Sequence, residues 1–517
     1  MKIIVKYMIC AIVLSGFVSS CTSNFEEYNT NPNEPTSLES GALITQLINC
    51  LASPEENPCQ RNNTFWAAFG GYVTATNTWN WGNYNYYTYN VGDKENRWSA
   101  DWYFTEFYKN YFSILRMNQA SCIPLAKLLR VDVMQRVACM QGPLPYSKVK
   151  EGTFTVPYDD EETAFKVMFD DLDASIKELS DIAATMTSDV NPLVGYDPIY
   201  NGDYKKWVKY ANSLKLRMAI RIARIEGYDE YAHQKALEAV THPIGVMESS
   251  SDTAWDHLNG RYKNGFETVQ GWGEIRANAC IVAFMNGYQD PRREVYFKKI
   301  NDGQGDAYIG VRSGISGITT DMYKTASKFN VETTTPMLVF SAAEVAFLRA
   351  EANLIGWTDV CDNAETYYKQ GISISFAERG ISSTHPSAYY NNSTDRPAAF
   401  EDMNNSKYNY TPKNTVTIKW ENSASDEEKL NRIITQKWIA NFPLGHEAWN
   451  DYRRTGYPDI FPAGDNLSIR GITSERGQRR LRFSQTEYET NSSNVKAAAA
   501  AMGGDKETTD LWWAKKN

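Results

Sequence analysis

Apolar residues that recur three or four positions apart predict amphipathic helices along much of this chain. The clearest case lies between residues 203 and 227. Asp203 is a suitable N-cap, and Gly227 is a suitable terminator. The residues that form the apolar stripe are Trp207, Ala211, Leu214, Met218, Ile222 and Ile225. This spacing predicts a helix of about six turns with one face buried.

A second helix is predicted over residues 341–357, and a partner helix over about 363–379. Ser341 and Glu344 have the spacing of a capping box, and Gly356 follows the last apolar position. Two such antiparallel helices cannot bury their apolar faces alone, so further pairs must stack on them. Similar pairs are predicted at 97–120 with 123–140, and at 161–181 with 203–226. Because the spacing is irregular, the pattern indicates tetratricopeptide-like pairs without a strict repeat.

Long stretches without periodicity separate and follow these helices, at about 242–340, 381–425 and 456–517. They are rich in Gly, Ser, Asn, Thr and aromatic residues, apart from a short helix and turn predicted at 497–504. Irregular segments of this length in a compact domain often carry function. The pattern therefore predicts a helical scaffold joined to an irregular, ligand-binding half.

The N-terminus has the layout of a secretory signal peptide, residues 1–20. Lys2 and Lys6 precede an apolar run at 7–18 that is shorter than the roughly 20 residues needed to span a bilayer. Small residues then precede Cys21, as in bacterial lipoprotein signals, although Val18 stands where Leu is usual. We expect lipidation at Cys21 and a flexible polar tether over 21–40. The alternative is an ordinary signal followed by an incidental cysteine.

Composition excludes some functions and leaves others open. The net charge is −9, only 22% of residues are charged, and no Lys/Arg-rich block occurs, so nucleic acid is not an expected partner. No C-x-x-C pair is present, so a zinc site is not expected. Cys50 and Cys59 are close enough in sequence to form a disulfide in an oxidising compartment, or to remain buried thiols.

No enzyme signature emerges from the sequence, and no cofactor or metal is predicted. Phosphate-binding, dinucleotide-binding and nucleophile-elbow motifs are absent, and His446–Glu447 lacks the second histidine of a zinc-protease motif. The acidic run at 159–162 precedes a predicted helix, where carboxylates favour the positive end of the helix dipole. That structural interpretation is preferred to a pair of glycosidase carboxylates, whose separation sequence alone does not give. We therefore predict no catalytic residue.

Polar aromatic residues are abundant, with 32 Tyr and 14 Trp against 21 Phe. Residues 79–90, "WNWGNYNYYTYN", alternate rings with amides, a combination that suits a sugar because its C–H faces are apolar and its hydroxyls need polar partners. Covering about 100 Å² of sugar face contributes roughly 2.5 kcal/mol. The predicted ligand-binding residues are Trp79, Trp81, Asn83, Tyr84, Trp255, Asn259, Trp272, Glu274 and Arg276. The alternative for any of these rings is packing in the core.

An ordered set of motifs resembles the SusD/RagB-type outer-membrane lipoproteins, specifically the second SusD-like group. The set comprises "NTNPNEPT" near the N-terminus, "GPLPYS" (142–147), "WVKYANSLKLRMAIRI" (207–222), "DPRR" (290–293), "SAAEVAFLRAEANLIGW" (341–357), "IITQKWIANFPLGHEAWNDYRRTGYPDIFP" (433–462) and "LWW" (511–513). The segment 479–491 departs from the usual pattern. The resemblance spans nearly the whole chain, and the ordered set is specific although no single piece is.

The resemblance implies an all-α fold of tetratricopeptide-like helix pairs with a large irregular ligand-binding half. It places one SusD-like domain over 41–517, with the scaffold at about 41–240 and 336–380 and the ligand half at about 242–335 and 381–517. It also implies a non-catalytic lipoprotein on the exterior of the outer membrane that passes oligosaccharide to a SusC-like TonB-dependent transporter. Two alternatives remain: a binding subunit for peptides or another non-glycan nutrient, and a surface glycosidase. The glycan and any calcium ion are not specified.

Overall fold

A computed structural model describes residues 39–77, 89, 93–301, 305–381 and 385–514. The predicted signal peptide, Cys21 and nearly all of the predicted tether lie outside the described residues. So do Trp79, Trp81, Asn83 and Tyr84, although the strand that leads into their segment is described. The structure therefore reports on the scaffold and on the second half of the predicted ligand site.

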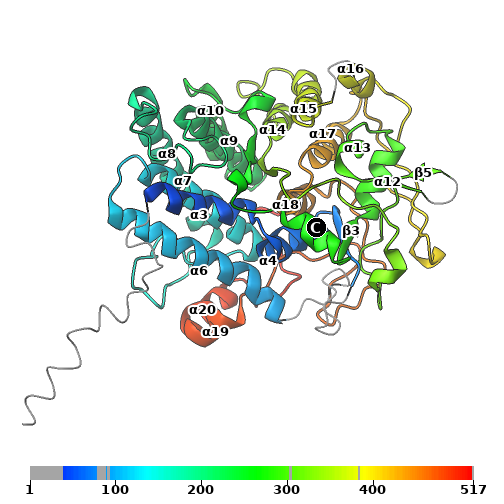
Figure 1. The fold of residues 1–517 in the computed structure, drawn as a ribbon, viewed down its shortest axis with the longest axis horizontal. Coiled ribbons are helices and arrows are strands. Elements are labelled where there is room, and N and C mark those ends of the chain that lie inside the picture. The colour runs from blue at the N-terminus through cyan, green and yellow to red at the C-terminus, as the bar shows by residue number, and fades with distance from the viewer. Residues whose placement is uncertain (1–38, 78–88, 90–92, 302–304, 382–384, 515–517) are drawn as a thin grey trace, which may run out of the picture.

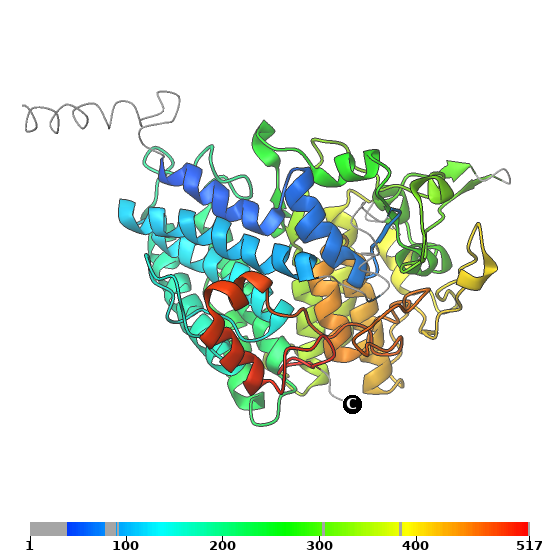
Figure 2. The same ribbon diagram turned by 90° about the horizontal axis from the view of Figure 1, so that it is seen from below.

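Long helices stack side by side to form one half of the molecule (Figures 1 and 2). The helices of this half are α3 (Ser40–Ala52), α6 (Asp93–Met117), α7 (Ile123–Gln141), α8 (Glu161–Thr185), α9 (Tyr204–Ile222), α10 (Asp229–Thr241), α14 (Ala342–Leu354), α15 (Ala364–Glu378), α17 (Asp426–Ala440) and α18 (Gly445–Thr455). Neighbours along the chain pack together, α6 on α7, α8 on α9 and α14 on α15. All three predicted helix pairs are confirmed.

Local signals set the helix starts better than the helix ends. The Asp203 carboxylate accepts a hydrogen bond from the Lys206 amide, as predicted for an N-cap. However, α9 ends at Ile222, and turns occupy the residues up to Gly227. At α14, Ser341 accepts a hydrogen bond from the Ala343 amide, but the predicted capping box does not form.

Glu344 leaves the capping box because its carboxylate is turned into the core. Both of its oxygens accept hydrogen bonds from Arg217 of α9, each at 2.8 Å. The two side chains are 0% and 1% exposed, so the pair is fully buried. A buried carboxylate with a bidentate guanidinium partner is better satisfied there than at an exposed helix terminus. This tertiary contact overrides the local signal.

Helices α17 and α18 extend the scaffold beyond its predicted limits, since both lie in the region assigned to the irregular half. Helix α17 packs against α14 and α15, and its Lys437 lies 3.0 Å from Asp451 of α18. The Arg454 guanidinium is paired with Glu351 of α14. These buried charged residues interrupt the apolar period that identifies a helix from sequence.

Short elements and loops build the other half of the molecule, on the right of Figure 1. Its strands pair antiparallel in three two-stranded sheets: β1 (Val73–Ala75) with β3 (Ile275–Ala277), β2 (Ala254–Asp256) with β6 (Met337–Phe340), and β4 (Ile300–Asn301) with β5 (Asp306–Ala307). Its short helices include α4 (Glu56–Pro58), α5 (Phe65–Phe69), α11 (Gly265–Gly271), α12 (Ala279–Gly287), α13 (Arg293–Tyr296) and α16 (His385–Tyr390), with 3₁₀ turns at η3 (Ser250–Asp252), η4 (Leu258–Gly260), η5 (Thr320–Tyr323) and η6 (Ser406–Tyr408), and a π-helical turn at η1 (Cys59–Thr64). Near the C-terminus, α19 (Gln485–Thr490) and α20 (Ser492–Ala501) lie against the helical half (Figure 2).

The possible Cys50–Cys59 disulfide does not form. Both residues are free thiols in the described structure, and both side chains are buried. Burial raises the pKa of the Cys59 thiol to about 12 and that of Cys50 further, so neither ionises readily. The two residues act as small apolar side chains in the core.

Candidate functional site

A short antiparallel ladder fixes the point where the aromatic segment leaves the core. Strand β1 pairs with β3 in the register Val73 with Ala277 and Ala75 with Ile275. The ladder continues one step further, where the Thr76 amide donates to the Glu274 carbonyl at 2.8 Å. The stem of the aromatic segment is therefore held beside residues 272–274.

Trp272 lies on the turn that follows α11 and is 51% exposed, far more than the tryptophans of the core. The turn is tight, since Gly273 has φ +84° and a β-carbon there would approach Thr320 Cγ2 at 2.4 Å. The Thr76 hydroxyl also donates to the Gly273 carbonyl. A large ring held at the surface by a fixed turn is available to a flat ligand.

The structure separates the roles of Glu274 and Arg276. Glu274 is half-buried next to Trp272, and its carboxylate accepts a hydrogen bond from Gln60 Nε2 at 2.8 Å. Arg276 is 3% exposed and donates to the backbone carbonyls of Ile275, at 2.7 Å, and of Lys324, at 3.3 Å. Burial lowers the pKa of its guanidinium. Arg276 thus tethers backbone in this structure and does not present its charge to the surface.

Trp255 lies elsewhere, in a groove of about 360 Å³ that Trp272 does not line. On β2 the neighbours Ala254 and Asp256 are buried, whereas the half-buried Trp255 ring forms part of the groove wall. The apolar wall of the groove comprises Trp255, Phe266, Val295, Tyr296, Phe329, Val331, Pro336, Met337, Leu338, Phe442, Pro443 and Leu444. Its polar side chains are Asn63, His257, Asn264, Asn330, Thr335, Glu378 and Arg379.

Asn259 is exposed in the 3₁₀ turn η4, with φ +45°. It lines neither the groove nor the turn at Trp272. Hence the described part of the predicted set falls into two places, Trp272 with Glu274 at the end of the β1–β3 ladder, and Trp255 in the groove.

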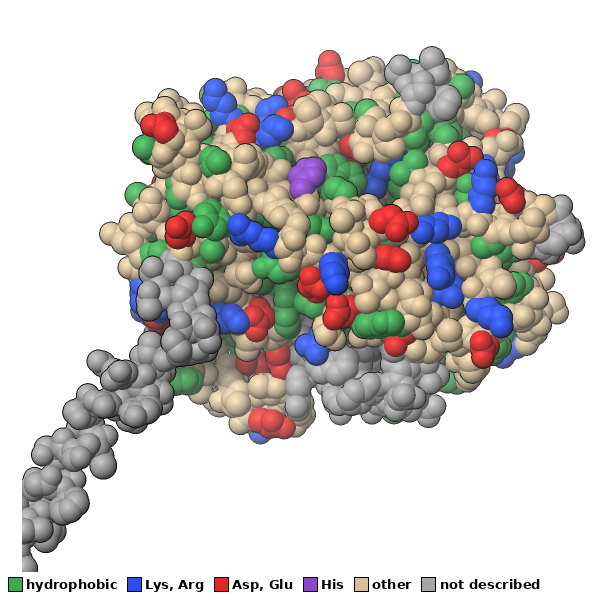
Figure 3. Space-filling view, viewed as in Figure 1, with side chains coloured by type: hydrophobic (Ala, Val, Ile, Leu, Met, Phe, Trp, Pro, Cys, Tyr) green, Lys and Arg blue, Asp and Glu red, His purple; other side chains and the backbone are tan. Residues whose placement is uncertain are grey.

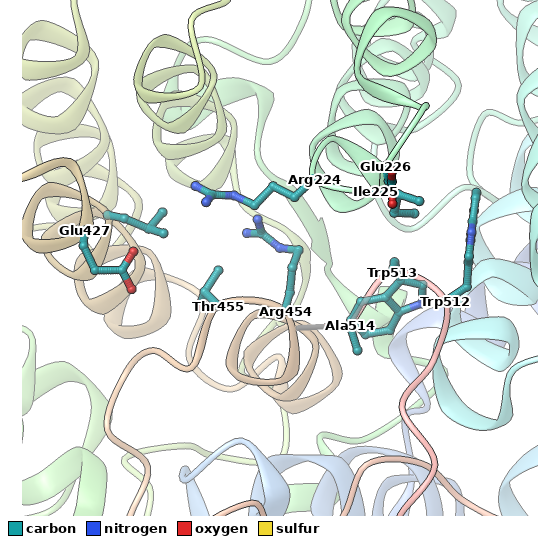
Figure 4. Close-up of a pocket in the computed structure, with 10 residues that line it drawn as sticks. Arg224, Ile225, Glu226, Glu427, Arg454, Thr455, Trp512, Trp513 and Ala514 are labelled. Atoms are coloured by element: carbon teal, nitrogen blue, oxygen red, sulfur yellow. The ribbon is translucent and has the colours of Figure 1, made fainter. Parts of the chain in front are cut away.

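A second cavity, of about 440 Å³, opens between the ends of scaffold helices (Figure 4). In that view Glu427 lies on the left, Trp512 and Trp513 lie on the right, and Arg224 and Arg454 lie between them. Much of this lining is already engaged, since Arg454 pairs with Glu351 and Asp451, and the Trp512 ring meets Tyr228 edge-on at 4.9 Å. Sequence reasoning did not single out this cavity.

The acidic and histidine motifs considered for catalysis have structural partners. The Asp160 carboxylate caps α8 by accepting from the Thr163 amide at 2.7 Å, and Asp159 accepts from the Tyr146 and Ser147 amides. Burial would raise the pKa of Glu447, but Arg221 and Arg217 hold it well below its ordinary value. Burial lowers the pKa of His446 beside it. These contacts support the structural interpretation of both motifs.

The face of the molecule in Figure 3 shows no large patch of a single charge. On the face in Figure 3, basic and acidic side chains alternate, with apolar side chains scattered between them. Among the residues that the structure describes, no group of three or more His, Cys, Asp or Glu is arranged to hold a metal ion. In the same residues, no helix has both the length and the apolar character that crossing a bilayer requires.

The family model described as "SusD-like: Susd and RagB outer membrane lipoprotein" matches residues 23–514. The chain belongs to the SusD-like family. This confirms the resemblance drawn from the ordered motifs, and with it the all-α, tetratricopeptide-like architecture. No curated protein matches the chain.

Solved SusD-like structures cover the chain almost completely. A SusD-like protein from Bacteroides thetaiotaomicron is 42% identical with a TM-score of 0.87, over 92% of this chain and 99% of that one. A SusD homologue from Bacteroides ovatus is 33% identical with a TM-score of 0.85, over 92% and 99%. A chitin-binding SusD homologue from Flavobacterium johnsoniae is also 33% identical with a TM-score of 0.85, over 92% and 99%.

Sequence reasoning missed the groove residues that surround Trp255, above all Tyr296 and Arg379. Arg379 follows the last residue of α15, a common place for a cation because helix carbonyls end there. That signal places a charge at a helix terminus but does not reveal which rings lie against it. Tyr296 comes from α13, about 80 residues away in sequence, so only tertiary structure brings the two together.

Proposed function

We propose that this SusD-like protein captures an oligosaccharide at the cell surface without transforming it and delivers it to a SusC-like TonB-dependent transporter. The observation that carries the proposal is the exposed Trp272 ring, held beside the stem of a segment rich in rings and amides. A chitin-binding homologue shares the architecture over nearly the whole chain, which supports a glycan as the ligand.

In this proposal a lipid at Cys21 moors the protein to the outer membrane, facing the exterior. The family description names outer-membrane lipoproteins, and the sequence around Cys21 has the matching signal. The helical half would contact the transporter, while the irregular half holds cargo. Proteolytic shaving of intact cells, followed by mass spectrometry of the N-terminal peptide, tests both the location and the acyl group.

Capture followed by release requires weak binding, which stacking provides. One covered sugar face contributes about 2.5 kcal/mol, and a few hydrogen bonds less the ordering cost give a dissociation constant of the order of millimolar to micromolar. Trp272 would provide one platform and Glu274 an acceptor for a hydroxyl. Trp79, Trp81, Asn83 and Tyr84 remain proposed partners on the adjacent segment.

The decisive experiment is isothermal titration with chitin oligosaccharides and a panel of other glycans. We expect Trp272→Ala, alone or with Trp81→Ala, to weaken binding at least tenfold (about 1.4 kcal/mol) while thermal unfolding stays unchanged. Phe154→Ala is the matched control, because that ring is 92% exposed but lies on the loop before α8. Unchanged glycan affinity in the tryptophan variants would show that these residues do not form the binding site. Release of reducing ends from a glycan would contradict a non-catalytic role.

A further inference from the structure

The Trp255 groove contains a guanidinium that lies close to two aromatic rings. Arg379 Cζ lies 4.8 Å from the centroid of the Trp255 ring and 4.7 Å from that of Tyr296. The Arg379 Nη2 donates to the Phe442 carbonyl at 2.5 Å, just beyond the C-terminus of α17. The two rings and the carbonyl together fix the position of this cation.

The rest of this guanidinium has no hydrogen-bond partner among the described residues. Arg379 Nε is buried without one, and no bond from Nη1 accompanies those of Nη2. Among the described residues, no carboxylate lies within ion-pair distance of Arg379. Arg217 and Arg454, by contrast, each have a carboxylate partner. The neighbouring Glu378 accepts hydrogen bonds from Thr253, Ser341 and the Ala343 amide, and feels the Arg379 charge from beyond ion-pair distance. With Nε buried and Nη2 already donating, Nη1 is the donor that Arg379 has to offer an anion.

The walls of the groove favour an apolar, flat ligand over a neutral sugar. The Phe329 ring contacts both Phe266 and Phe442, with centroid distances of 5.2 and 4.9 Å. The amides are largely committed, because Asn264 donates to the Thr335 carbonyl and Asn63 to that of Ala52. A volume of about 360 Å³ falls within the range of small-molecule sites.

We propose that this groove is a second binding site, for an apolar, ring-bearing carboxylate whose carboxylate pairs with Arg379. The ring lies along Trp255 and the phenylalanines, and the carboxylate meets Nη1 of the guanidinium. Charge complementarity selects the anion, since a carboxylate brought into an apolar groove needs a cation there to offset its lost hydration. The site is separate from the glycan surface at Trp272 and does not depend on it.

Titration of the full-length protein with 3-phenylpropionate and with its neutral isostere 3-phenylpropionamide tests the proposal. We expect the acid to bind at least tenfold more tightly than the amide. Arg379→Gln should abolish that preference, and Arg379→Lys should keep part of it because a positive charge remains. Trp255→Ala should weaken both ligands.

Two control variants separate this site from other surfaces. Arg224→Gln removes an exposed arginine from the cavity in Figure 4 with the same change in net charge, and should leave both affinities unchanged. Trp272→Ala should also leave them unchanged while it lowers glycan affinity. If Arg379→Gln unfolds, the ratio of the affinities for the acid and the amide, measured in the wild type and in Arg379→Lys, still tests the proposal. Equal binding of acid and amide, no binding of either, competition by a neutral glycan, or a preference that survives Arg379→Gln would overturn the proposal.

Discussion

Arg217 and Glu344 form a bidentate pair in the core, although 127 residues separate them in sequence. The Glu344 carboxylate also accepts from Asn441 at 3.0 Å, and Lys437 lies 3.5 Å away. Helices α9, α14 and α17 thus share one buried carboxylate. The pair ties the first part of the scaffold to the last.

Removing one member of this pair should be costly. We expect Arg217→Met to lower the free energy of unfolding by about 3–5 kcal/mol, because it leaves a buried carboxylate short of its main partner. Urea denaturation monitored by circular dichroism measures the change. Lys177→Met, in an exposed pair whose side chains are 80% and 72% exposed, should change stability by less than about 1 kcal/mol. Similar losses of unfolding free energy in both variants would show that burial does not determine how much an ion pair contributes to stability.

Stability should fall in acid through Glu447. Since the folded pKa of Glu447 lies below the ordinary value of 4.5, its ionised form stabilises the fold above that pH, and the contribution is lost as the pH drops below it. We expect the urea midpoint to start decreasing as the pH falls through the ordinary value of 4.5 and to keep decreasing down through the lower folded pKa. Glu447→Gln should flatten this dependence. The control is Glu332→Gln, at an exposed residue, which should keep the wild-type dependence of the urea midpoint on pH. An unchanged pH dependence in Glu447→Gln would show that Glu447 does not cause the acid sensitivity.

Gly445 lies where α18 crosses α5, and a side chain has no room there. An added β-carbon would approach the Ala67 nitrogen at 2.0 Å, a contact with backbone that cannot rotate away. We expect Gly445→Ala to cost at least about 1–3 kcal/mol in thermal or urea unfolding. Gly271→Ala is the control, since a β-carbon there meets nothing within 4 Å. Equal stability of the two variants would mean that α18 and α5 can move apart at no cost in free energy.

Reductant should not affect stability, because Cys50 and Cys59 are free thiols. We expect the melting temperature to be the same with and without dithiothreitol. Alkylation in urea without reductant should label both cysteines, while native protein reacts slowly because burial raises the thiol pKa values. A 2 Da mass deficit in the peptides that contain them, removed by reductant, would show that the disulfide forms after all.

Helix positions were predictable from sequence where apolar residues dominate the buried face, as in α9 and α14. Helices α17 and α18 were not predicted; α9 and α14 also bury a charged pair, Arg217 with Glu344, but they keep a continuous apolar stripe. Lys437 and Arg454 look solvent-exposed in a pattern analysis, yet each is enclosed with its carboxylate partner. Glu344 fitted a capping box by spacing, and only the distant Arg217 explains why its carboxylate turns inward.

The site was predictable in residue type more than in arrangement. Trp272 is exposed, as a stacking platform requires, whereas Arg276 is buried on backbone carbonyls. Trp255 and Trp272 were both predicted to bind ligand, but β2 and the end of α11 carry them to different places. Amino-acid composition does not predict how far apart two residues lie in the fold, because that distance depends on which strands pair.

The buried charges have a consequence for engineering. Because residues 217, 344, 437 and 454 pair across α9, α14, α17 and α18, we expect a cut between them to leave buried charges without their partners. Trp272, on an exposed turn, and Trp255, in the groove wall, take no part in these buried ion pairs. New specificity is therefore best sought by diversifying those surface positions within the intact chain, and not by exchanging pieces between relatives.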